Sequence, residues 1–374
     1  MMTGNHVATL CVSTCGTSLL TNGVDNELRL LLSRTANLSA GELTDEQRET
    51  IEARLRKQVQ RLQASKPEQA ATMCAELKGI LGHASPKPPL AHREQHILLH
   101  TDTWQGEIVA NALCDWLRSQ GLEAHTHRLK SLSTRSMDDF RSGIDSLIVW
   151  CDDTLDGYRS SQYRIVFNLT GGFKSLQGFM QTLGMFYADE LIYGFETGEL
   201  LRIPRLPLEF ESSVQQAVRQ HLSVFRRLQF PHHKVSIADC QGIPEAFLYQ
   251  LEDSIDLNNW GRLVWQRYRK QLYQEVLPPL SEKLRFSAAV KAQARELTTD
   301  RRVTFNEQMD DLSRYLDSGQ TQPTNSLDFK RLRGNPMPPA THECDLWADR
   351  GAWRAFGHFE GATFVIDQIG PGLH

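Results

Sequence analysis

The stretch from Asn168 to Gly178, NLTGGFKSLQG, constrains the fold of this chain more than any other part of it. It follows the apolar run 163–167, which predicts a buried strand, and it leads into the pattern 175–187, which predicts a helix. A strand that turns into a helix through Thr-Gly-Gly leaves backbone N–H groups exposed at the helix start. Those groups and the helix dipole favour an anion, so the stretch predicts a phosphate-binding turn.

The residues of this turn suit a bound phosphate for separate reasons. Gly171 and Gly172 remove side-chain bulk, so that a ligand can approach the backbone, and Lys174 adds a mobile positive charge. Asn168 and Thr170 add polar side chains to the candidate set. The spacing Gly-x4-Gly-Lys-Ser/Thr of a P-loop is absent, and a plain strand-to-helix turn with an exposed lysine is the alternative interpretation.

A second polar loop follows the first apolar run of the chain, 6–13, which also predicts a buried strand. In open α/β sheets, ligands bind at the carboxyl ends of the strands, where this loop is expected to lie. Its polar side chains could donate to phosphates or base edges, but on this loop alone we favour the capping of the next helix. The candidate residues are Thr14, Gly16, Thr17, Ser18 and Asn22.

Strands and helices alternate through the first two hundred residues, which predicts an α/β fold with a doubly wound parallel sheet. A helical hairpin over 43–82 and a helix over 107–119 separate strand patterns. Thr44 and Gln47 resemble a capping box at the start of the hairpin. The further expected strands are 95–100, 124–129, 146–151, 191–196 and 200–203. The strand 95–100 ends in Thr101, Asp102 and Thr103, so a third polar loop is expected to meet the other two at one sheet edge.

Length and composition bound the class of protein. The chain has 374 residues, which suggests two or three domains, and a formal net charge of −4, so any nucleic-acid site must be a local patch. Its seven cysteines are scattered without zinc-like spacing, which is typical of reduced, buried thiols in a cytosolic protein. The start of the chain does not resemble a signal peptide, and no apolar run long enough for a membrane span occurs. We therefore expect a cytoplasmic protein without membrane contact.

The chain changes character after the proline-rich segment 204–207, where we place a domain boundary. Residues 205–285 are mostly helical, and they include a basic, aromatic helix with Trp260, Trp265 and Tyr268. A turn before such a helix could make a helix-turn-helix that binds DNA. We favour a packing and dimerisation domain, because these aromatic residues suit a core or an interface.

The last segment, 286–374, is expected to form a small α+β module. Helices over 290–316 are followed by strand patterns at 341–348, 352–360 and 363–369. Cationic and histidine side chains gather there, and aromatic rings beside them could stack on unpaired bases. No carboxylates with two-metal spacing stand out, so metal-independent RNA cleavage is the natural chemistry, and a solvated basic edge is the alternative. The candidate catalytic residues are Lys330, Arg331, Arg333, Arg350, Arg354, His358 and His374.

Residues 6–203 resemble a CARF domain, the CRISPR-associated Rossmann-like sensor of cyclic oligoadenylates. The resemblance rests on STCGTSLLTN (13–22) and NLTGGFKSLQG (168–178), each after a strand. It implies a homodimer that holds cyclic tetra-adenylate across its two-fold axis, with the residues of both loops as ligand contacts. Some CARF domains also cut their ligand, and Ser13, Ser18 and Lys174 leave that possibility open.

Residues 286–374 resemble the RelE family of ribosome-dependent mRNA interferases, through KRLRG, THECDLWADRGAWRAFGHFE and ATFVIDQIGPGLH. Residues 205–285 are similar to winged-helix segments that follow CARF domains. The RelE resemblance implies cleavage of mRNA in the ribosomal A site without a metal, which leaves a 2′,3′-cyclic phosphate. RelE-like toxins often carry a late tyrosine, but this chain has none after Tyr315, so His358 or His374 would replace it.

Together these resemblances match the CARF–RelE fusion effectors of type III CRISPR systems. They imply a sensor at 1–204, a connector at 205–285 and an mRNA interferase at 286–374, with no cofactor besides the activating nucleotide. Lys330 or His358 would be the general base, and His374 is a candidate acid. Two other functions are weighed: a ligand-responsive transcription regulator, and a ring nuclease that only degrades the cyclic oligoadenylate.

Overall fold

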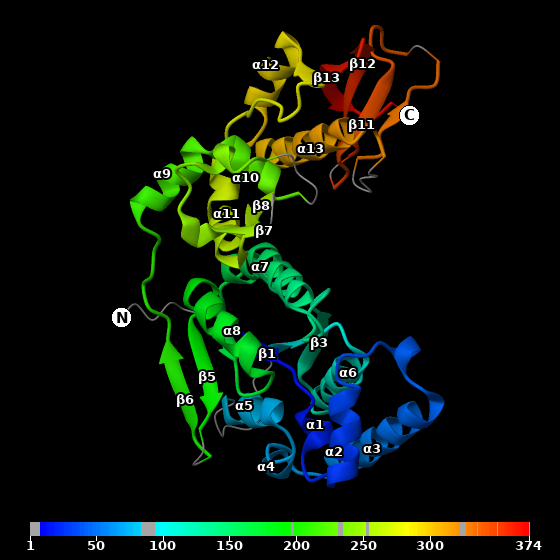
Figure 1. Ribbon diagram of the computed structural model, residues 1–374, viewed down its shortest axis with the longest axis vertical. Coiled ribbons are helices and arrows are strands. Elements are labelled where there is room, and N and C mark those ends of the chain that lie inside the picture. The colour runs from blue at the N-terminus through cyan, green and yellow to red at the C-terminus, as the bar shows by residue number, and fades with distance from the viewer. Residues whose placement is uncertain are drawn as a thin grey trace. The chain divides into compact units, whose positions relative to one another are not determined.

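The computed structural model describes residues 8–83, 94–195, 198–230, 235–251, 254–321, 327–334, 336–349 and 351–373. The chain divides into two compact units, Met1–Glu209 and Phe210–His374, and each is described by itself (Figure 1). No helix within the described ranges is both long and apolar enough to cross a membrane.

The N-terminal unit is built on a six-stranded sheet with the strand order β3-β2-β1-β4-β5-β6. The first five strands are parallel, and β6 is antiparallel to β5. This mixed α/β arrangement is compatible with a Rossmann-like fold, and it confirms the predicted parallel sheet. The strands are β1 (Ala8–Thr14), β2 (Glu94–His100), β3 (Glu123–Arg128), β4 (Tyr163–Asn168), β5 (Glu190–Gly194) and β6 (Leu200–Pro204).

Both faces of this sheet are covered. The consecutive β1 residues Leu10 and Cys11 point to opposite faces, and both are fully buried. The expected helical hairpin is present as three helices, and Thr44 forms the predicted capping box with Gln47 at its start. The helices are α1 (Ser18–Thr21), α2 (Asn26–Arg34), α3 (Asp45–Gln63), α4 (Pro67–Ala70), α5 (Ala75–His83), α6 (Trp104–Ser119), α7 (Met137–Ser160) and α8 (Lys174–Tyr187).

The strand that the sequence predicted at 146–151 is wrong, because this segment lies inside α7. Ser136 caps the helix by accepting from the Asp139 amide. The buried positions Ile144, Leu147, Ile148 and Cys151 are spaced three and four residues apart, which is the period of a helix face. A short apolar run viewed alone does not show this longer period, so it fits a strand and a buried helix equally.

The C-terminal unit begins with α9 (Ser212–Gln220) and α10 (Leu222–Leu228). The described residues between α10 and α11 (Asn259–Leu272) form two 3-10 turns and the hairpin β7 (Leu248–Leu251) and β8 (Ser254–Leu257). A hairpin therefore stands where a helix-turn-helix would have a short turn. Asn258 caps α11 through the Trp260 and Gly261 amides, and Trp265 is buried, as predicted, in the core of this region.

The rest of this unit is a five-stranded sheet in the order β10-β11-β12-β13-β9, with helices on one face. Its strands are antiparallel except β9, which is parallel to β13. Figure 1 shows α13 beside the strands β11 to β13, and helices followed by antiparallel strands are as predicted. The elements are β9 (Leu284–Phe286), α12 (Ala288–Glu296), α13 (Thr299–Asp317), β10 (Lys330–Arg331), β11 (His342–Trp347), β12 (Trp353–Glu360) and β13 (Thr363–Pro371).

The seven cysteines are all free and buried, as the sequence predicted. Burial raises the pKa of the Cys11 and Cys344 thiols to about 12. They are packing residues at neutral pH rather than nucleophiles.

Candidate functional site

The loops after β1 and β4 meet, as predicted, where the strand order of the sheet reverses. From β1 the chain continues to β2 on one side, and from β4 it continues to β5 on the other, which is the position where open α/β sheets bind ligands. The Thr14 hydroxyl donates to the Gly171 carbonyl at 2.6 Å. Gly172 has a φ of +91°, and a Cβ there would lie 2.9 Å from Thr14 Cβ, so this close approach requires glycine.

Thr14 and Asn168 join the two loops, and Thr170 joins the β4 loop to the end of β5. Thr14 and Asn168 are fully buried. Asn168 Nδ2 donates to Ser13 Oγ at 3.2 Å and to the Glu76 carbonyl at 3.1 Å. Thr170 Oγ1 accepts from the Gly194 amide at 2.9 Å. Their side chains fix the shape of the site.

The β1 loop is organised by a residue that the sequence did not single out, Glu76 in the first turn of α5. Its Oε1 accepts from the Gly16 amide at 2.8 Å, and its Oε2 accepts from the Ser18 hydroxyl at 2.7 Å. Asn22 Nδ2 donates to the Met73 carbonyl at 3.1 Å. Thr17 is the N-cap of α1 but makes no side-chain capping bond, so the capping favoured for this loop is wrong for Thr17.

The start of α8 offers donors to an anion. Its N-cap is Phe173, which has no side-chain acceptor. The backbone amides of residues 171–175 donate to no other part of the chain that the structure describes. Lys174 is the first residue of α8 and is exposed. Unpaired amides, the helix dipole and a lysine together favour a bound phosphate.

The side chains of the third predicted loop, 101–103, bond to β3, to the segment after β3 and to α6. The Asp102 carboxylate binds Arg128 Nε at 2.6 Å and the Ser131 amide at 2.7 Å. Thr103 caps α6 through the Gly106 amide, and its hydroxyl lies 2.8 Å from that of Thr101. Among the described residues, no side-chain hydrogen bond joins this loop to the other two. Asp102 instead lines a separate polar hollow of about 460 Å³ with Asn37, Ser39, Glu42, Ser131, Ser133, Arg135 and Asp139.

In the C-terminal sheet, predicted cations lie against carboxylates. Lys330 is opposite Glu343, and Arg354 is opposite Asp345, so all four lie on the face that α12 and α13 leave uncovered. Arg354 Nη1 donates to Glu343 Oε1 at 2.7 Å, and its Nε lies 3.0 Å from Asp345 Oδ1. The Lys330 ammonium contacts the Asp328 carboxylate and lies 3.9 Å from Glu343 Oε1.

His358 lies on the same face of β12 as Arg354, four residues further along the strand. Its Nδ1 is 2.8 Å from Asp367 Oδ2, and its Nε2 is 3.3 Å from Glu360 Oε1. The hydrogen bond to Asp367 is the main cause that raises the pKa of His358 above its ordinary value. A raised pKa favours the imidazolium, which is the form that donates a proton.

Of the four remaining predicted catalytic residues, the structure describes two. Arg331 and Arg333 are exposed. Arg350 and His374 lie outside the described residues. His342, which was not among the predicted catalytic residues, stacks on Phe329 with ring centroids 5.4 Å apart, so it has a packing role.

Most of the aromatic rings expected to stack on bases pack in the interior of the C-terminal unit instead. Phe356 is fully buried, and Phe329 and Phe359 pack against the core that α12 and α13 cover. Trp347 and Trp353 are partly exposed and stack on each other at 5.5 Å. Both tryptophans also pack against the core that α12 and α13 cover, and Arg301 of α13 lies over the Trp347 ring.

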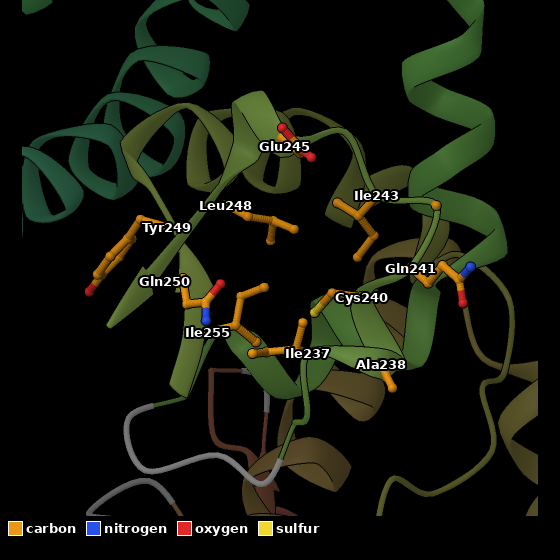
Figure 2. A pocket seen from close by; sticks show the side chains of 11 residues that line it. Ile237, Ala238, Cys240, Gln241, Ile243, Glu245, Leu248, Tyr249, Gln250 and Ile255 are labelled. Atoms are coloured by element: carbon orange, nitrogen blue, oxygen red, sulfur yellow. The ribbon is translucent and has the colours of Figure 1, made fainter. Parts of the chain in front are cut away.

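The C-terminal unit also contains a cavity that the sequence did not predict. It measures about 560 Å³ and lies between the hairpin β7–β8 and the turns before it (Figure 2). Apolar side chains such as Ile243, Leu248 and Ile255 point into it, with Glu245 and Gln250 at its edges. None of the predicted site residues lines this cavity.

Comparison with known proteins bears on the N-terminal unit. Residues 71–206 match a protein family described as CRISPR-associated protein (Cas_APE2256). The match covers less than half of the chain, and it includes Glu76, β4 and the start of α8. It supports a CRISPR-associated role for the chain. No curated protein matches the sequence.

Proposed function

We propose that this chain is a CRISPR-associated endoribonuclease that a cyclic oligoadenylate switches on. The N-terminal unit would bind cyclic tetra-adenylate as a homodimer, and residues 286–374 would cut ribosome-bound mRNA. The observation that carries the sensor half is the uncapped start of α8 beside Gly171 and Gly172, at the reversal point of a parallel sheet. The CRISPR-associated family match over the same residues supports this half.

The ligand-binding part of the proposal uses the accessible residues of the two loops. Lys174 and the amides at the start of α8 bind a phosphate of the ligand, because they combine an exposed cation with unpaired donors. Gly172 lets the phosphate approach the backbone. Thr14 and Asn168 are buried and fix the position of the two loops through hydrogen bonds, so they have no direct contact with the ligand.

The cleavage part of the proposal uses the uncovered face of the C-terminal sheet. The 2′-oxygen attacks the neighbouring phosphorus and the P–O5′ bond breaks, which yields a 2′,3′-cyclic phosphate and a 5′-hydroxyl. Arg354, Arg331 and Arg333 stabilise the negative charge that develops on the phosphate. His358 donates its proton to O5′, and Lys330 is the candidate base for the 2′-hydroxyl.

The carboxylates on this face set a condition for binding RNA. Glu343 and Asp345 neutralise Arg354, so an RNA phosphate must compete with them for the guanidinium. An arginine has five donors in a planar fork and can serve both partners. The carboxylates orient Arg354 through Nη1 and Nε, and Nη2 of the guanidinium is left to bind the RNA phosphate.

The sensor half is tested by binding of cyclic tetra-adenylate, measured by calorimetry. Lys174→Ala is expected to weaken binding at least tenfold, because a phosphate loses its cation. The matched control is Lys57→Ala on α3, an exposed lysine of the same unit, and it should bind as the wild type does. Equal affinity of Lys174→Ala and wild type would overturn the proposed site.

A further inference from the structure

The carboxylate of Glu76 occupies the place where the β1 loop would receive an anion. It is fully buried, and it accepts from both the Gly16 amide and the Ser18 hydroxyl. A Cβ added to Gly171 would lie 2.4 Å from Glu76 Oε1, so the glycine of the β4 loop leaves room for this carboxylate. Glu76 therefore lies between the two loops that form the candidate ligand site.

No cation among the described residues forms an ion pair with this buried charge within 4 Å. The carboxylate is stabilised by its two donors and by its position in the first turn of α5. Its field acts on neighbouring groups. After burial itself, the Glu76 charge is the next cause that raises the pKa of the Cys15 and Cys74 thiols.

We propose that Glu76 is an internal anion that weakens the hold of the sensor on its phosphate ligand. The inference rests on the ligand site proposed above. Glu76 stays in place when the ligand binds, keeps the Gly16 and Ser18 donors occupied, and repels the phosphate held at the start of α8. Unit charges about 10 Å apart near a protein surface interact strongly enough to change an affinity about tenfold.

This arrangement raises the ligand concentration at which the sensor responds, and it shortens the lifetime of the bound state. A sensor that must switch off when its ligand is degraded needs fast dissociation of that ligand. Affinity differences between related complexes lie mostly in the dissociation rate, so a lower affinity gives faster dissociation. Replacement of the charge by a neutral group of the same shape should therefore tighten binding.

Glu76→Gln is that replacement. Its carbonyl oxygen can still accept from the Gly16 amide, which fixes the orientation of the new amide group. The amide nitrogen then donates to Ser18 Oγ, which already accepts from the Ala75 amide at 3.0 Å. The Ser18 hydroxyl hydrogen is released from Glu76 and can point to a ligand phosphate. The variant thus removes a repulsion and adds a donor.

The test measures the dissociation constant of cyclic tetra-adenylate for the full chain and its variants. Glu76→Gln is expected to bind about tenfold more tightly than wild type, with a slower dissociation rate. Glu76→Asp, which keeps the charge, and Glu68→Gln, which removes an exposed charge on α4, should show no tightening. Unchanged or weaker binding by a folded Glu76→Gln would overturn the inference.

A second variant keeps the inference testable if Glu76→Gln does not fold. Because the Ser18 hydroxyl is bound to Glu76, Ser18→Ala should change the wild-type affinity less than twofold. A tenfold loss would mean that Ser18 contacts the ligand and that Glu76 does not hold its donor. Failure of the wild type to bind cyclic tetra-adenylate at all would overturn the ligand site itself, and this outcome differs from the other two.

Discussion

His358 and Asp367 form a close pair on the uncovered face of the C-terminal sheet, with Nδ1 of the imidazole 2.8 Å from Oδ2 of the carboxylate. Asp367 raises the pKa of His358, so the imidazolium persists to higher pH than in a free histidine. If His358 is the general acid, cleavage falls as pH rises through this raised pKa. Asp367→Asn removes the main cause of the shift, so the falling limb of the rate–pH profile should move to lower pH.

This profile is best measured as single-turnover cleavage at saturating activator, so that binding does not limit the rate. Glu360→Gln serves as the comparison, because Glu360 contributes less than Asp367 to the pKa of His358. It should move the same limb by a smaller amount. A falling limb that Asp367→Asn leaves at the same pH would remove His358 as the general acid.

The variant Arg354→Ala tests the proposed cleavage site separately from the proposed nucleotide site. Arg354→Ala should lower the single-turnover rate by about a hundredfold or more, the usual effect of removing a group that stabilises transition-state charge. Its affinity for cyclic tetra-adenylate should be unchanged. Arg295→Ala, an exposed arginine on α12, is the matched control and should cleave normally. Normal cleavage by Arg354→Ala would remove this residue from the proposed active site.

Asp310 on α13 receives buried hydrogen bonds from Arg226 of α10 and from Tyr273, the C-cap residue of α11. Arg226 donates to its carboxylate through two nitrogens, one of them Nε at 3.2 Å, and the Tyr273 hydroxyl also contacts it. Asp310→Asn leaves the buried guanidinium without its counter-charge, so we expect a loss of about 3–5 kcal/mol of stability. Denaturant unfolding of the full chain measures this loss.

The control is Asp300→Asn in the exposed first turn of the same helix, which should cost less than about 1 kcal/mol. A loss of similar size in both variants would show that the buried pair does not hold these helices together.

Gly172 and Gly178 make a matched pair near the start of α8. Gly172→Ala should disturb the ligand loop, because φ is +91° and the new Cβ would meet Thr14; we expect strain of about 1–3 kcal/mol and weaker ligand binding. Gly178→Ala should instead stabilise α8 by up to about 1 kcal/mol, since nothing lies within 4 Å of its Cβ position. Thermal unfolding and ligand titration distinguish the two.

The sequence predicted the elements whose cause is local. The loops after β1 and β4 follow apolar strand patterns, and parallel strands bring their carboxyl ends to one edge, so the contact between Thr14 and Gly171 was foreseeable. The capping box at Thr44 depends on two residues three positions apart. The helices and antiparallel strands of the last module followed from their periodicity.

The features that were missed depend on distant residues. Glu76 lies 60 positions after Gly16, and nothing in its own helix marks it as a partner of that loop. The pairing of Arg354 with Glu343 follows from strand register, which the sequence does not state. One signal was available: Cys344 and Leu346 alternate inward, so Glu343 and Asp345 had to point to the other face of the sheet.

The central claim is that a nucleotide bound by the N-terminal unit switches on RNA cleavage by the C-terminal sheet. The most direct measurement incubates the protein with translating ribosomes, with and without cyclic tetra-adenylate, and maps the new mRNA ends. We predict ends within ribosome-bound codons that appear only with the nucleotide and disappear in Arg354→Ala. Intact mRNA in the presence of bound nucleotide, with turnover of that nucleotide or salt-sensitive DNA binding instead, would contradict the claim.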